Sequence, residues 1–201
     1  MSARPNSKIS LASLALLLAG SLGACAAPVR KAEATPSGSL ELLEALQPGD
    51  IVVAPVRNQT GSKRVPLDEL RAGLSNAIIG RMYNPLDTAY VDKNWVESSF
   101  KGSPAPDGLL VMAVTQWNVN HLYSTGKVSM QAELLLFAGG STTGEALWGM
   151  QVNDTVDLSD GKGNPPAPSP LLMGEAAERL AVKALASLPM RDPVAAHEPK
   201  L

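Results

Sequence analysis

The chain has little of what catalysis and metal binding need. Its 201 residues include one cysteine, and its two histidines are His121 and His197. One cysteine cannot form an internal disulfide, and no His/Cys/Asp group has the spacing of metal ligands. Neither a Gly-x-Ser-x-Gly elbow nor a phosphate-binding loop is present. The sequence therefore predicts no enzyme activity, no cofactor and no metal.

An excess of charge of either sign is also missing, and so is a long apolar run. Seventeen Lys and Arg oppose 19 Asp and Glu, a formal net charge of −2. Without a basic stripe, no nucleic-acid partner is expected. The main apolar run, Ile9–Gly20, is shorter than the roughly 20 residues that a spanning helix needs.

The N-terminal region has the organisation of a secretory signal peptide. Arg4 and Lys8 make its first residues basic, and the apolar run Ile9–Gly20 follows directly. A basic end followed by a short apolar run and small residues is typical of export. The alternative, an N-terminal core helix, does not explain the uneven charge.

The residues after this run are Leu22, Gly23, Ala24 and Cys25, and they resemble the lipobox of bacterial lipoproteins. The resemblance implies cleavage after Ala24 and two or three acyl chains on Cys25, enough for stable membrane anchoring. A free thiol or an intermolecular disulfide is the alternative use of this cysteine. Because Ala26 is not Asp, we expect the periplasmic side of the outer membrane.

Composition divides the chain into four parts. Residues 1–24 are expected to be a lipoprotein signal peptide, and residues 25–39 a lipidated cysteine and a flexible tether rich in Ala, Pro, Ser and Gly. Residues 40–190 are expected to form an α/β domain. Residues 191–201 contain two prolines and little that could pack, so we expect a loose C-terminal tail.

The domain pattern predicts an α/β (α+β) fold: a single mixed β-sheet with helices packed on it, in the order (α)βαβ(α)βββα. Apolar stripes predict two long helices, and alternation predicts a hairpin. Expected helices cover 40–46, 66–82 and a segment capped by Ser169; expected strands cover 50–56, 88–91, 109–119, 127–137 and 145–155; 93–100 is expected to be a helical turn or loop. The stripe of the 66–82 helix is Leu67, Leu70, Leu74, Ile78 and Met82.

The run Ile51–Thr60 (IVVAPVRNQT), followed by a helix, resembles the opening of small periplasmic lipoprotein domains related to LpoB, CsgG and the TolB N-terminal domain. This resemblance implies a non-enzymatic docking or assembly module for envelope machinery, such as peptidoglycan synthases or secretion complexes. A CsgG-type pore is not expected, because the hairpin strands are needed to complete the sheet and Glu133 lies mid-strand.

Five residues are candidates for binding. Asn58 and Thr60 follow the first strand, where they either complete a turn or contact a ligand at the carboxyl end of the sheet. Trp95 and Phe100 either form an exposed patch for a partner or, the favoured use, cover a sheet edge. His121 is interpreted as a surface turn residue rather than a general base, since no partner is suggested.

An acidic group, Asp154, Asp157 and Asp160 before Gly161, has some character of calcium ligands. Its acids are three residues apart, whereas an EF-hand loop places them every second residue. A solvated turn is therefore the favoured interpretation. Trp148 alternates with core positions and is expected to be buried.

Three functions are compatible with these patterns. The leading hypothesis is a lipid-anchored module that docks on an envelope protein or self-associates. The second is a binder of a small ligand or cell-wall glycan through the loops near Asn58, 118–121 and 154–160. The third, an envelope hydrolase, is disfavoured by the missing catalytic groups. No second membrane contact beyond the lipid is suggested.

Overall fold

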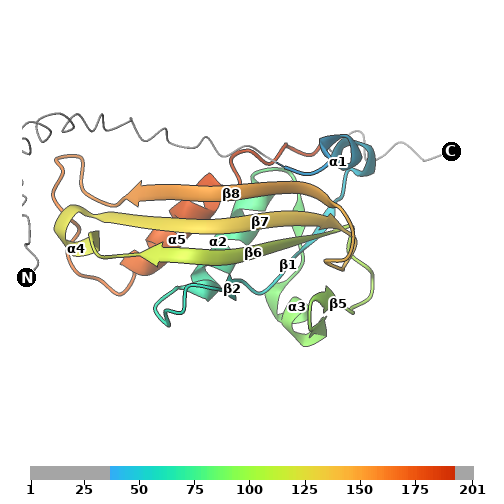
Figure 1. Cartoon of the computed structure of the whole chain (residues 1–201), viewed down its shortest axis with the longest axis horizontal. Coiled ribbons are helices and arrows are strands. Elements are labelled where there is room, and N and C mark those ends of the chain that lie inside the picture. The colour runs from blue at the N-terminus through green and yellow to red at the C-terminus, as the bar shows by residue number, and fades with distance from the viewer. Residues whose placement is uncertain (1–36, 193–201) are drawn as a thin grey trace, which may run out of the picture. The chain divides into compact units, whose positions relative to one another are not determined.

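The structure, a computed structural model, describes residues 37–192. The expectations for the signal peptide, Cys25, most of the tether, His197 and the tail from residue 193 lie outside this range. Within it, a mixed six-stranded sheet carries helices on its faces (Figure 1). The predicted fold class is confirmed.

The sheet combines a parallel half with an antiparallel half. The short strands pair in parallel with one another or with the first long strand, and the three long strands form an antiparallel meander. Its order is β3 (Asn84–Pro85), β1 (Asp50–Val53), β6 (Gly108–Asn118), β7 (Lys127–Ala138) and β8 (Ala146–Asp157), and β2 (Arg57–Asn58) also pairs with β6.

Two helices, α2 (Leu67–Ile79) and α5 (Leu172–Ala184), cover one face of the long strands (Figure 1). Their apolar stripes meet side chains that alternate along β7 and β8, including the fully buried Trp148. Burying one Leu side chain in this layer contributes about 1.5–3 kcal/mol. This larger core therefore fixes which sheet face is covered.

A smaller core lies on the opposite side of β1 and β6. It contains Val52 and Leu109 and is covered by α3 (Thr88–Asn94) and a hairpin of β4 (Trp95–Val96) and β5 (Ser99–Phe100). The strand predicted at 88–91 is wrong. Asp87 caps a helix here, because its Oδ1 accepts a hydrogen bond from the Tyr90 amide at 2.9 Å. The segment 93–100, expected to be a helical turn or loop, is the end of α3 followed by the hairpin of β4 and β5.

Several predicted boundaries shift for local reasons. The first strand ends at Val53, ahead of Pro55 rather than at residue 56. Helix α2 ends at Ile79, so Met82 leaves the predicted stripe; it has φ +68° and is exposed. The helix cap predicted at Ser169 is wrong: α5 begins at Leu172 with Leu171 as its N-cap, and Ser169 Oγ accepts from the Leu171 amide in the turn before it. The short helix α4 (Leu122–Thr125) was not predicted.

Both ends of the described chain belong to the domain. Ser37 exchanges two backbone hydrogen bonds with Gly149 on β8, and Ser39 caps α1 (Leu40–Leu46). After α5, the Arg191 amide donates to Arg81 O, and the Asp192 amide donates to Gln47 Oε1. Folding therefore includes residues that composition assigns to the tether and the tail.

Candidate functional site

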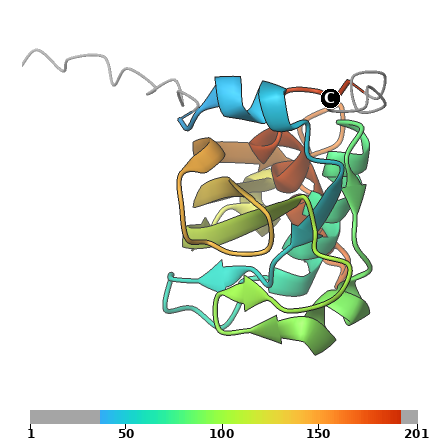
Figure 2. The same ribbon diagram turned by 90° about the vertical axis from the view of Figure 1, so that its right-hand side faces the viewer.

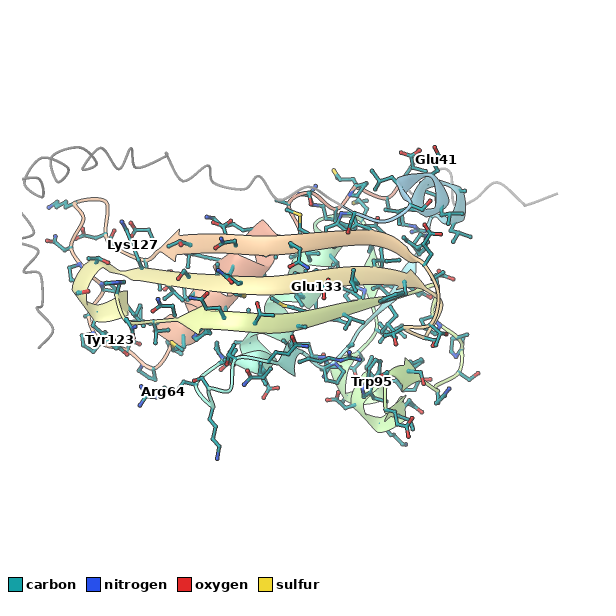
Figure 3. The ribbon with its side chains drawn as sticks, viewed as in Figure 1. Glu41, Arg64, Trp95, Tyr123, Lys127 and Glu133 are labelled. Carbon is teal, nitrogen blue, oxygen red and sulfur yellow. The ribbon has the colours of Figure 1, made fainter. Side chains whose placement is uncertain are left out.

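The face of β6, β7 and β8 that points away from α2 and α5 is solvent-accessible around Glu133, beyond the part that the smaller core covers; we call this accessible part the open face (Figure 3). Cross-strand pairing aligns its side chains in rows, and Glu133 lies in the middle between Ala113 and Gln151. The Gln151 Nε2 donates to Glu133 Oε1 at 2.9 Å. The open face consists of Ala113, Thr115, Ser129, Gln131, Glu133, Gln151, Asn153 and Thr155, all exposed or half-buried.

Chemically, the open face offers hydrogen-bond donors and acceptors with little charge. Amides and hydroxyls dominate it, Glu133 is the carboxylate at its centre, and the exposed cross-strand pair Lys127 and Asp157 lies at its end. Arg57 of β2 pairs in register with Ala113 at the neighbouring edge, and its Nη2 donates to Ser98 Oγ at 3.1 Å. A solvated face is common in antiparallel sheets. Here it gives a flat polar surface that can hydrogen-bond to another molecule.

The Asn58 and Thr60 side chains form a turn. Asn58 Oδ1 accepts from the Thr60 amide at 3.0 Å and from Thr60 Oγ1 at 2.8 Å, and Asn58 Nδ2 donates to Ser62 O. Thr60 Oγ1 in turn accepts from the Ser62 amide. The turn interpretation is confirmed, and most of the hydrogen-bonding capacity of these side chains is used within the loop.

Trp95 and Phe100 pack on the smaller core over the interior strands β1 and β6, and not on a sheet edge as the favoured prediction stated. Phe100 is 6% exposed, so the exposed-patch reading is wrong for this ring. Its ring meets that of Tyr90 edge-on, with centroids 5.6 Å apart, and Trp95 is half-buried against the same core. Hydrophobic burial over β1 and β6 explains why these aromatics turn inward.

His121 and the acidic residues do not converge on one point. His121 is exposed and precedes α4, where its carbonyl accepts the Thr125 amide. Asp154 binds Lys183 Nζ at 2.8 Å, while Asp157 and Asp160 each accept hydrogen bonds from their own loops. No group of three or more His, Cys, Asp or Glu side chains able to hold a metal occurs within residues 37–192.

Hydrogen bonding sets the electrostatics of this acidic loop. The Asn164 side chain, helped by loop amides, holds the pKa of Asp160 below its ordinary value of 3.8. Hydrogen bonds from Ser159 lower the pKa of Asp157 in the same way. These carboxylates stay ionised and shape a solvated turn, as the sequence favoured.

A shallow groove of about 540 Å³ lies between α5 and the end of β8. Val156 and Val182 give it an apolar part, and charged side chains surround them. Two of those cations already have partners, because Arg179 Nη1 donates to Asp157 O and Lys183 Nζ donates to Thr155 O. The groove therefore offers no free cationic group from these two residues, and its lining suggests no reaction.

Sequence reasoning missed Arg71, a charged side chain buried between layers. It is 6% exposed; its Nε donates to Val53 O at 3.0 Å, and its Nη1 binds Asp92 Oδ1 at 2.5 Å. The burial of Arg71 could have been suspected from the sequence, because this arginine follows Leu70 in the apolar part of α2. Its contacts join α2, β1 and α3, so its role is structural.

Cys25 lies outside the described residues, together with Leu22, Gly23 and Ala24. Among the helices that the structure describes, none is long and apolar enough to cross a membrane.

Neither a protein-family model nor a curated protein matches the sequence. Among solved structures, the chain is similar to a PelC dodecamer from Paraburkholderia phytofirmans, with TM-score 0.45 and 15% identity over 76% of this chain and 96% of that one. It is also similar to lipoprotein GNA1162 from Neisseria meningitidis, with TM-score 0.42 and 15% identity over 70% and 100% of the respective chains. Similarity at this level assigns neither a family nor a function.

Proposed function

We propose that this chain is a non-enzymatic, lipid-anchored envelope lipoprotein whose domain docks onto another envelope protein or a second copy of itself. The resemblance of Leu22–Cys25 to a lipobox supports the anchor, and Ala26 supports the periplasmic side of the outer membrane. The LpoB-, CsgG- and TolB-like run Ile51–Thr60 supports membership of an envelope assembly concerned with peptidoglycan synthesis or secretion.

The observation that carries the docking role is the open face. Both long helices lie on the other side of the sheet, which leaves three aligned strands uncovered around Glu133 (Figure 3). Protein interfaces combine desolvated contacts with about one hydrogen bond per 100–200 Å². Gln131, Gln151 and Asn153 supply such donors and acceptors on a rigid support.

Substitution of surface residues by arginine tests the docking role of the open face in cells. Gln131→Arg and Glu133→Arg place a cation on the open face, whereas Glu178→Arg places one on the exposed side of α5. After mild cross-linking, we expect the native protein and the Glu178 variant to yield the same specific complex, and the open-face variants to lose it. Equal recovery from all four proteins would refute the open face as the docking surface.

A second candidate function is binding of a cell-wall glycan or small ligand. It is favoured by the amides and hydroxyls of the open face, which match the hydrogen-bonding groups of sugars. The loops expected to bind lie toward one end of the sheet, around α4 and the ends of β2 and β8 (Figure 1). Muropeptides at a hundred times their Kd would raise stability by about 2.7 kcal/mol, measured as a Tm shift.

A further inference from the structure

Exposed large hydrophobic side chains are concentrated on three segments of the domain. They lie on α1, at the end of α2 and the corner that follows it, and on the segment after α5. The six residues are Leu40, Leu42, Leu46, Ile79, Met82 and Met190, between 43% and 62% exposed, out of ten such side chains within the described range. Single exposed apolar residues are ordinary, whereas a concentration calls for a partner.

Hydrogen bonds to backbone carbonyls hold the three segments together. The Arg191 amide donates to Arg81 O at 3.0 Å, and Arg191 Nε donates to Gln47 O at 3.3 Å. Tyr83 Oη donates to Pro189 O at 3.0 Å. Figure 2 shows α1, the end of the described chain and the corner after α2 along one side of the domain. We call this side the anchor-side surface.

The segment that leads to Cys25 enters the domain at this same side. Ser37 is bonded to β8 and Ser39 caps α1, so the chain joins the fold beside Leu40. Twelve peptide units separate Cys25 from Ser37. At 3.3–3.6 Å each, they limit the separation of these residues to about 40 Å. A lipid on Cys25 would therefore keep the point where the chain enters the domain, beside Leu40, within this distance of the bilayer.

We infer that the anchor-side surface rests on the phospholipid bilayer that holds the lipid, so that the domain has a fixed orientation; this inference depends on the proposed lipidation of Cys25. Because the lipid on Cys25 tethers the domain, the contact of the anchor-side surface with the bilayer is effectively intramolecular. A weak apolar contact is then enough to orient the domain. Cations are not in excess near α1, because Glu41, Glu44, Asp107 and Asp192 accompany Arg81 and Arg191 there. Apolar insertion therefore dominates over attraction to anionic headgroups.

Such an orientation leaves the far end of the sheet, around α4, at a distance from α1 and its contact with the membrane. The α4 end of the molecule, with Tyr123, lies far along the strands from α1 (Figure 3). The loops that follow β2 and β8 lie toward that end and would face the periplasm. A partner would then meet the domain from the side or from above the bilayer.

Environment-sensitive labels on the full lipidated protein test the inference. Because Cys25 is acylated in this scheme, an engineered cysteine is the free thiol for labelling. Leu46→Cys and Met190→Cys report on the anchor-side surface, and the exposed Tyr123→Cys is the matched control. The proteins are reconstituted into phosphatidylethanolamine–phosphatidylglycerol vesicles that contain a brominated lipid as quencher.

We expect a blue shift and quenching at positions 46 and 190 and neither at 123, with little change between low and high salt. Adding Leu42→Gln and Leu46→Gln to the Met190 reporter should reduce both signals, whereas Val182→Gln, on exposed α5, should not.

Three results would overturn the inference, and they are distinguishable. Vesicle-bound protein with all labels in water refutes the docking but leaves the anchor intact. Failure of every labelled protein to bind vesicles refutes the lipidation and the docking together. A shift at 46 and 190 that needs high protein concentration, and occurs equally without vesicles, assigns the surface to a second copy instead.

Discussion

Arg71 places a permanent charge where α2, β1 and α3 meet. Its guanidinium satisfies the Val53 carbonyl, which otherwise loses its partner at the end of β1. A buried polar group left without a hydrogen bond costs about 1–3 kcal/mol, and a charged partner raises the cost. The side chain therefore stabilises the point where the parallel strand ends.

We predict that Arg71→Met lowers the free energy of unfolding by about 2–3 kcal/mol in urea denaturation. Arg179→Met is the matched control, because Arg179 forms an exposed i,i+4 pair with Glu175. It should cost under about 1 kcal/mol. Equal losses for the two variants would contradict the structural role of Arg71.

Tyr83 makes stability sensitive to alkaline pH. Burial raises the pKa of its phenol above the ordinary value of 10.0, although Arg191 and Arg81 oppose this shift. The unfolded chain therefore loses this proton first, and the free energy of unfolding falls as pH rises above about 10. We predict a shallower decline for Tyr83→Phe than for the native protein, measured by denaturant unfolding from pH 8 to 11. Tyr123→Phe, at an exposed site, should leave the decline unchanged.

At the scale of elements, α2 and α5 pack closely because Gly73 has no side chain. A Cβ there would lie 2.9 Å from Ala181 Cβ and 3.0 Å from Glu178 Cα. In contrast, a Cβ on Gly174 would meet only Glu69 Cγ, at 3.6 Å. The two helical glycines thus differ in packing.

We predict opposite signs for the same substitution at these sites. Gly174→Ala should gain up to about 1 kcal/mol from helix propensity. At Gly73 a similar gain is outweighed by overpacking of 1–3 kcal/mol, so Gly73→Ala should lower Tm. Thermal unfolding of both variants is the measurement. A higher Tm for Gly73→Ala would contradict the prediction, because it would show that α2 and α5 move apart without lowering the free energy of unfolding.

Long periodic segments were predictable because hydrophobic alternation specifies them locally. The strands at 109–119 and 127–137, and the presence of a long last helix, agree with the structure. Thr88–Asn94 was not predictable as a helix from its apolar residues. The Asp87 cap and packing on β1 decide its conformation, and only the first is visible in sequence.

At the scale of the whole molecule, the candidate surfaces depend on tertiary contacts. Asn58 and Thr60 were identifiable as turn residues because their bonds are local. The anchor-side surface joins residues 144 positions apart through Arg191 and Gln47. No periodicity in the sequence encodes that contact, so the anchor-side surface could be identified only from the folded structure.

The lipid anchor gives a prediction at this same scale. Cells fed an alkyne analogue of palmitate should label the native protein, and Cys25→Ser should abolish the labelling because the chain has no other cysteine. Mass spectrometry of the native protein should find an acylated N-terminus at residue 25. An intact segment 1–24, or label retained by the serine variant, would disprove lipidation.

The hydrogen bonds of Arg191 and Asp192 to Gln47 bring the end of the described chain back to α1, where the chain also enters the domain. An affinity handle placed at residue 192, where the described chain ends, would thus lie beside α1, on the side for which we infer the membrane contact. Inserting the handle in the solvated turn at Gly161–Gly163, at the other end of β8, leaves that side clear. Purification and imaging of this protein are best built on that internal turn.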